Sequence, residues 1–134
     1  MKKKNYNILV VAAHPDDEAL GCGGTLAKHI SNGDIVKVVF LSDGETSRNE
    51  IKNNSINLRK KNSIKSLKII GVKKKNIIFN TLPDNALDSI PLIKITKILE
   101  DIKILFRPDV IYTHFGNDLN VDHRAAYNAT LIAF

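Results

Sequence analysis

Histidine and carboxylate side chains gather in one short run near the start of the sequence. The run reads His14-Pro15-Asp16-Asp17-Glu18 and directly follows an apolar segment that ends at Ala13. His14 and Asp17 are three residues apart, so a tight turn leading into a helix could face both toward one point. A histidine nitrogen and a carboxylate oxygen are standard ligands of Zn²⁺. The acids could instead cap the helix and interact with its positive end, but a single acid would suffice for that.

A second pair, Asp122 and His123, lies far along the chain. By itself this pair is equally well explained as a helix cap followed by a surface histidine. Together with His14 and Asp17, however, His123 would complete a His₂Asp site of the catalytic type, in which a bound water reaches a pKa of about 7. Asp16 would then be a spare carboxylate beside that water, where a general base belongs.

The elements that must position these residues alternate along the chain. Short β-branched runs predict strands, and apolar residues at helical spacing predict helices. The predicted strands are Tyr6–Ala12, Ile35–Leu41, Asn76–Asn80 and Val110–Thr113. The predicted helices are Ala19–Ser31, Ile56–Ile70, a segment that starts at Pro91 and stops before Pro108, and a last one from Asp122 to Phe134. This order predicts an α/β, Rossmann-like three-layer sandwich, with a mostly parallel sheet of about four strands and helices on both faces.

In such sheets, ligands bind beyond the carboxyl ends of the strands. The polar residues that follow the four strands in turn are His14, Asp16, Asp17 and Glu18; Ser42, Asp43 and Glu45; Asp84; and His114, Asp118, Asn120, Asp122 and His123. If the first strand pairs with both the second and the fourth, the first and fourth loops lie side by side. We therefore expect the two histidine-bearing loops to meet at one edge of the sheet.

Other candidate residues have simpler interpretations. We expect His29 to be exposed in the middle of a helix and His114 to form hydrogen bonds within its own loop. The run Gly21-Cys22-Gly23-Gly24 does not follow a strand directly and lacks a phosphate-binding lysine, so it does not predict a nucleotide loop. We interpret its small residues as allowing the helix to pack closely on the sheet, with Cys22 as a buried residue rather than a nucleophile.

Composition restricts the class of protein. The chain has 134 residues, of which 43% are hydrophobic and 25% charged, as in an ordinary single globular domain. One cysteine excludes an internal disulfide framework and suits a reducing compartment. No stretch approaches the roughly 20 apolar residues of a membrane span, and the apolar run behind Met1–Lys4 is too short for a signal peptide. We expect a cytoplasmic protein without a membrane span.

The net charge of +6 comes from 20 basic and 14 acidic residues. Apart from the runs Lys2–Lys4 and Lys73–Lys75, the lysines are scattered, and neither run is interleaved with aromatic residues. This pattern favours a solvated basic surface over a nucleic-acid partner.

Several segments, in order, resemble the PIG-L/LmbE family of zinc-dependent N-acetylglucosaminyl deacetylases. They are Val10–Glu18 with Leu20–Thr25, then Leu41–Glu45, Arg59, Leu82–Asn85 and His114–Arg124. The resemblance covers nearly the whole chain, and the run Ala13–Glu18 paired with a distant Asp-His is its most specific part.

The resemblance implies a metal site and a reaction. His14, Asp17 and His123 would hold Zn²⁺, with Fe²⁺ as the alternative because His/carboxylate ligation discriminates poorly between them. Asp16 would be the general base for a zinc-activated water that removes the acetyl group from an N-acetylglucosamine-type conjugate. Asp122 would support His123 or the base.

The resemblance also implies that Arg59 and Asp84 bind the sugar or its substituent, so the expected partner is a small-molecule amino-sugar conjugate. Two positions depart from the family pattern. Asn120 stands where members often have a histidine; its amide could donate a hydrogen bond to an oxyanion but cannot carry a proton. Asn62 stands where an acid usually follows Arg59.

Family domains normally continue beyond the last ligand. We therefore expect residues 1–134 to form a single deacetylase-like domain that is truncated at its C-terminal end, so the activity of this chain stays open. The alternatives are a catalytically impaired metal- or sugar-binding fragment and, with less support, a nucleotide-binding α/β module. An uncovered sheet edge or apolar face would favour a homo-oligomer.

Overall fold

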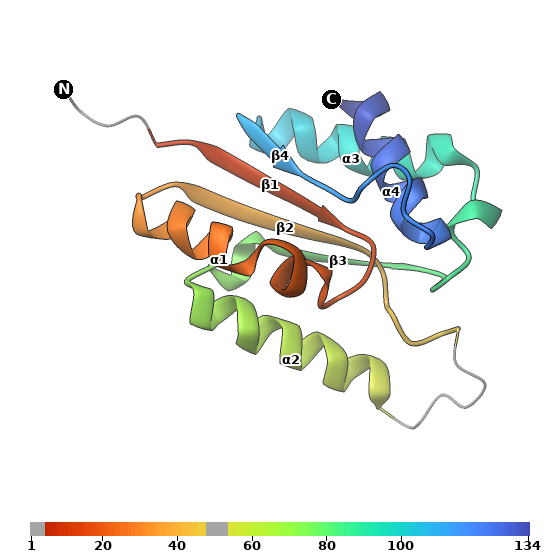
Figure 1. The fold of residues 1–134 in the computed structure, drawn as a ribbon, viewed down its shortest axis with the longest axis horizontal. Helices are drawn as coiled ribbons and strands as arrows, with labels where there is room; N and C mark the ends of the chain where they lie inside the picture. Colours follow the sequence, from red (N-terminus) through yellow and green to blue (C-terminus); the bar gives the residue numbers. More distant parts are fainter. Residues whose placement is uncertain (1–4, 48–53) are drawn as a thin grey trace.

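Four parallel strands form the centre of the computed structural model, which describes residues 5–47 and 54–134 (Figure 1). The strands are β1 (Asn7–Ala12), β2 (Ile35–Ser42), β3 (Ile77–Leu82) and β4 (Val110–Tyr112), in the spatial order β3-β2-β1-β4. All three neighbouring pairs are parallel. The predicted α/β class is confirmed. The run Lys2–Lys4 and residues 48–53, between β2 and the second predicted helix, lie outside the described residues.

Helices cover both faces of this sheet, as predicted (Figure 1). They are α1 (Asp17–Ser31), α2 (Ser55–Ile70), α3 (Leu92–Phe106) and α4 (Val121–Ala133), with short 3₁₀ turns η1 (Lys74–Asn76) and η2 (Leu87–Ser89). The helix α1 begins two residues before the predicted Ala19, so Asp17 belongs to its first turn. Within the described ranges, none of the helices has the length and apolar character needed to cross a bilayer.

The strand β1 is apolar at nearly every position because both of its faces are covered. Leu9 and Val11 pack with the buried residues of α3 and α4. Ile8 and Val10 point to the other face, where Leu26 of α1 packs with them. The sheet thus lies between two apolar layers, and the polar candidate residues lie in the segments that follow its strands.

The pairing of β1 with β4 aligns their carboxyl ends. Ile8 lies opposite Val110 and Val10 opposite Tyr112. At the other end of this pair, Asn7 donates its backbone N–H to the Asp109 carboxylate at 2.9 Å. The loops that follow β1 and β4 therefore leave the sheet side by side, as the sequence predicts.

The prediction that the glycines of α1 allow close packing on the sheet is wrong for Gly21 and Gly24. At Gly21 and Gly24 a Cβ atom would meet nothing within 4 Å, so close packing does not require glycine there. The kink of α1 lies at half-buried Cys22, whose φ and ψ are −143° and 16°. Gly71 does need to be glycine, because its φ is 105° and a Cβ atom would lie 2.7 Å from the Ile30 side chain.

Substituting these glycines tests the packing. Gly71→Ala should destabilise the fold by at least about 1–2 kcal/mol, because the left-handed cap of α2 excludes a side chain. The matched control Gly24→Ala, inside α1 with open space around it, should be neutral or stabilising by up to about 1 kcal/mol. Urea unfolding of both variants measures the difference, and equal effects would contradict the described packing.

Candidate metal centre

A tight turn after β1 places the side chains of His14 and Asp17 together. The backbone N–H groups of Asp16 and Asp17 both approach the His14 carbonyl oxygen, at 3.1 and 3.3 Å. In return, Asp17 Oδ2 accepts the backbone N–H of His14 at 2.8 Å. The ring atom His14 Nδ1 lies 3.3 Å from the same oxygen. The three-residue spacing thus works as predicted, with both ligand candidates facing one point.

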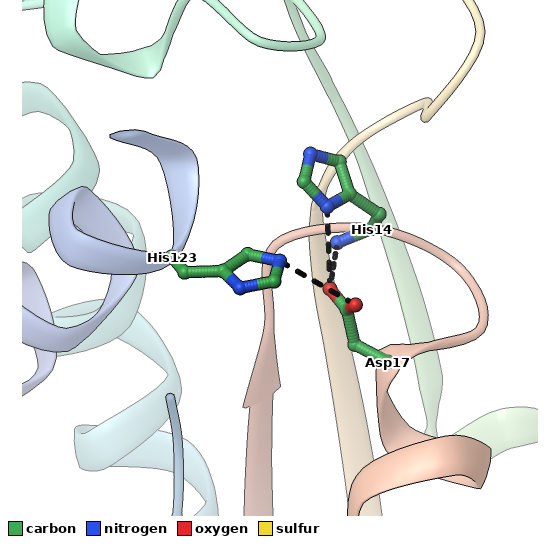
Figure 2. A group of neighbouring side chains, drawn as sticks. All are labelled: His14, Asp17 and His123. Atoms are coloured by element: carbon green, nitrogen blue, oxygen red, sulfur yellow. Dashed lines mark hydrogen bonds and ion pairs between the residues drawn. The ribbon is translucent and has the colours of Figure 1, made fainter. Parts of the chain in front are cut away.

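The helix α4 brings the third candidate to this point. Asn120 caps the helix, since its Oδ1 accepts the backbone N–H groups of Asp122 at 2.8 Å and His123 at 3.3 Å. Figure 2 shows His123 reaching from α4 toward Asp17, and His123 Nε2 lies 3.5 Å from Asp17 Oδ1. One donor atom each from His14, Asp17 and His123 lies within 4.8 Å of the others, so the group could hold a metal ion.

Each histidine of this group has a carboxylate behind it. His14 Nε2 lies 3.0 Å from Asp122 Oδ2, and His123 Nδ1 lies 2.9 Å from Asp118 Oδ2. Histidines that bind metals almost always donate their second ring N–H to such a partner, which fixes the tautomer and the ring orientation. We infer this tautomer from the contacts. With a metal bound, this tautomer would leave the lone pairs of His14 Nδ1 and His123 Nε2 for the ion, on the side where Asp17 lies.

The placement of Asp122 corrects one prediction. We expected it to support His123 or Asp16, but its Oδ2 contacts His14. It is fully buried (0% exposed) and also accepts the backbone N–H groups of Asn85 and Leu87, at 2.7 and 2.9 Å. These bonds satisfy the buried carboxylate and connect the loop after β3 to the site.

Asp84 reaches the same nitrogen of His14. Its Oδ1 lies 3.1 Å from His14 Nε2, its side chain is 5% exposed, and its Oδ2 accepts the Ser47 hydroxyl. His14, Asp84 and Asp122 form a second group with metal-ligand spacing. Because the Asp122 oxygens already accept backbone N–H groups, we interpret this second group as holding the His14 ring. The predicted contact between Asp84 and a sugar stays a prediction.

The carboxylates around His14 set its charge. Burial disfavours its charged form, but hydrogen bonds and charge contacts with the surrounding acids outweigh burial and raise the pKa of His14 to about 9. For Asp17, burial alone would raise the pKa, but the hydrogen bond with His14 outweighs it and lowers the pKa. Without a metal, the two side chains form an ion pair at neutral pH.

Arg59, predicted to bind substrate, contacts the predicted general base. From α2 its Nη2 lies 2.7 Å from Asp16 Oδ2, and its Nη1 lies 2.9 Å from Glu45 Oε1. Gly44 makes room for it, since its φ is 72° and a Cβ atom there would lie 2.8 Å from Arg59 Nε. A direct contact between Arg59 and a sugar stays a prediction.

His114 belongs to the site, which the sequence interpretation missed. Its Nε2 accepts the backbone N–H of Ala13 at 2.9 Å, so the expected hydrogen bond within its own loop is wrong. Its ring stacks on that of His123, with centroids 3.9 Å apart. Burial lowers the pKa of His114 to about 4, which keeps the ring neutral at pH 7. His114 thus packs against one face of the His123 ring and restricts its orientation.

The structure corrects the interpretation of His29 and agrees with that of Cys22. His29 is not exposed: its side chain is 19% accessible, its Nδ1 lies 2.6 Å from Asp34 Oδ2 and its Nε2 lies 3.0 Å from the Tyr112 hydroxyl. This chain of contacts ties the end of α1 to β4. Burial raises the pKa of the Cys22 thiol, which agrees with the view that it is not a nucleophile.

An open pocket of about 310 Å³ adjoins the metal-ligand candidates. Asp17 and His114 lie on its wall, and the remaining wall is formed mainly by α1 around Gly21 and by the end of β4 around Tyr112. A small group could therefore lie next to Asp17.

Removing the carboxylate behind His123 tests the proposed histidine geometry. Asp118→Ala should weaken Zn²⁺ affinity by about 10–100-fold, because the ring loses the partner that orients it. Asp101→Ala, an exposed acid on α3, is the matched control and should leave the affinity unchanged. Competition with a chromogenic chelator measures both affinities, and an unaltered value for Asp118→Ala would remove this residue from the site.

Comparisons with known proteins identify the family of the chain. The sequence model described as PIG-L, GlcNAc-PI de-N-acetylase, matches residues 9–134. The uncharacterized deacetylase YaiS of Escherichia coli K12 is 33% identical over 135 residues, which cover 97% of this chain and 69% of YaiS.

Solved structures share the fold. The conserved protein TT1542 from Thermus thermophilus superposes with a TM-score of 0.79 at 31% identity, covering 96% of this chain and 55% of that one. The N,N'-diacetylchitobiose deacetylase from Pyrococcus horikoshii gives a TM-score of 0.82 at 25% identity, covering 96% and 49%. The chain thus spans about half the length of these two proteins. Since the family match extends over nearly the whole sequence, the chain belongs to the PIG-L family of GlcNAc-PI de-N-acetylases.

Proposed function

We propose that the chain carries the metal ligands of a metal-dependent hydrolase that removes the acetyl group from an N-acetylglucosamine-type conjugate. The observation that carries this proposal is the pair of carboxylate-backed histidines. Each turns one nitrogen toward Asp17 and the other toward an acid. That arrangement is typical of metal-binding histidines.

The donor set suits Zn²⁺ and does not exclude Fe²⁺. Two imidazoles and one carboxylate are the ligands of many catalytic zinc sites, in which the remaining position is left for water or substrate. When bound by His14, Asp17 and His123, such an ion polarises a carbonyl group and lowers the pKa of a water molecule.

We assign the proton transfers to Asp16. Arg59 holds its Oδ2 at 2.7 Å, and the side chain is 49% exposed, so Oδ1 is the atom that we assign to the proton. Asp16 takes a proton from the water that attacks the amide carbon and returns it to the leaving nitrogen. The products are acetate and a free amino sugar, and the aspartate regains its original state.

The substrate class rests on relatives. The family description names an N-acetylglucosamine lipid, and the Pyrococcus enzyme is named for an N-acetylated disaccharide. Both substrates carry an acetamido group on a sugar, and the pocket beside Asp17 is large enough for a group of that size. We therefore propose an acetamido sugar as the group that is hydrolysed.

A second candidate is a metal- or sugar-binding fragment with impaired catalysis. It is favoured by one observation, namely that the chain spans about half the length of its solved relatives. The two candidates differ in turnover and share metal binding.

Removing the proposed base tests the function. Asp16→Ala should lower turnover of N,N'-diacetylchitobiose by at least about 100-fold, since the proton acceptor is lost, while metal content stays near that of the wild type. Release of free amine and metal analysis measure the two quantities. Loss of metal in this variant would move Asp16 into the ligand set. A wild-type chain that binds metal but releases no amine would favour the second candidate.

Asn120 offers a test of oxyanion stabilisation. Its Oδ1 caps α4, and its Nδ2 lies 3.3 Å from Asn85 Oδ1. If the amide also donates to the oxyanion, both Asn120→Ala and Asn120→Ser should lower turnover by about 100-fold. Only the alanine variant should also lose about 1 kcal/mol of stability, because serine still caps the helix. A serine variant with wild-type turnover would remove Asn120 from the mechanism.

A further inference from the structure

The backbone of Asp16 has an unusual conformation. Its φ of 154° and ψ of −24° lie in a region that residues with a side chain rarely adopt. Such conformations persist only where the surrounding structure holds them, and they cluster at functional sites. Asp16 is also the residue before α1, yet its carboxylate makes no capping hydrogen bond to the helix. The side chain of an aspartate in this position usually accepts a backbone N–H group of the first helical turn.

Glu18, two residues further on, binds the backbone of Asp16 instead. Its Oε2 accepts the backbone N–H of Asp16 at 3.0 Å, and its Oε1 lies 3.3 Å from the Ser63 hydroxyl of α2. The same N–H also approaches the His14 carbonyl oxygen at 3.1 Å, but that contact closes only a very short turn. Both contacts hold this N–H, and the Glu18 contact is the one that a side chain makes.

The Glu18 side chain is buried, which is unusual for an acid at the start of a helix. It is 2% exposed, whereas an acid in the first turn of a helix ordinarily interacts with the helix end from the solvent side. Burying a carboxylate is costly unless hydrogen bonds satisfy it. The Asp16 side chain, by contrast, is half-exposed.

We propose that Glu18 is a positioning residue that holds the strained backbone of Asp16 and so leaves the Asp16 carboxylate available for proton transfer. Asp16 is then held at two points, with Glu18 on its backbone N–H and Arg59 on its Oδ2. The catalytic part of this inference rests on the proposed function, and the anchoring of the Asp16 backbone does not. Displacements of about 1 Å can lower a rate by 10²-fold, so such anchoring matters for a general base.

Two variants of similar size separate hydrogen bonding from packing. Glu18→Gln keeps an oxygen that can accept the Asp16 N–H, whereas Glu18→Met fills the same space with no such acceptor. Leu26→Ala, a core truncation in the same helix, controls for general destabilisation. The readouts are the exchange rate of the Asp16 amide by NMR, metal content, and kcat and KM with N,N'-diacetylchitobiose.

We expect the Asp16 amide to exchange at least about tenfold faster in Glu18→Met than in Glu18→Gln or Leu26→Ala. The kcat of Glu18→Met should fall roughly 10- to 100-fold with KM and metal content unchanged, and glutamine should restore most of it. Equal amide exchange and equal kcat in Glu18→Met and Glu18→Gln would overturn the proposal. If the wild type releases no amine, the proposed function fails, while the exchange rates still decide whether Glu18 anchors Asp16.

Discussion

The parallel pairing of β1 with β4 is the constraint on which the candidate site depends. Parallel strands end at the same edge of a sheet, so the turn after β1 and the loop after β4 leave the sheet together. The bond from the Ala13 N–H to the His114 ring joins these two segments directly beyond the strands. From there the turn supplies His14 and Asp17, and the first turn of α4 supplies His123. Residues distant in sequence therefore meet without any long or flexible connection.

Charge then organises the side chains around His14. One nitrogen of its buried ring faces Asp17, and the other faces Asp84 and Asp122. Asp122 is fully buried, and backbone N–H groups of the loop after β3 donate to it, which offsets the cost of burying its charge. A third loop is thereby tied to the same edge of the sheet. The orientation of the His14 ring depends on this whole network. We therefore expect a change to the carboxylates on one side of the ring to alter the hydrogen bonding of the nitrogen on the other side.

The sequence predicts the framework better than the contacts within it. The alternation of strands and helices follows from apolar patterning. Once β1 pairs with β4, the rule for parallel sheets brings the two histidine-bearing loops together, so the grouping of His14 with His123 is predictable. The partner of each ring is not, because the direction of a side chain in a loop depends on tertiary packing. This is why Asp118 behind His123 was missed, and why Asp122 was expected at the wrong histidine. The same reason explains the burial of His29, whose partner lies on the distant strand β4.

The central claim is that two distant segments build one metal site. The most direct measurement is the metal content per chain of the wild type and of the double variant His14→Ala, His123→Ala, both purified without chelator and then supplied with Zn²⁺. We predict about one tightly bound ion per wild-type chain and none in the double variant, because both imidazole donors of the three-ligand site are removed. A wild-type chain that holds no metal when supplied with it, or a double variant that keeps its metal, would contradict the account.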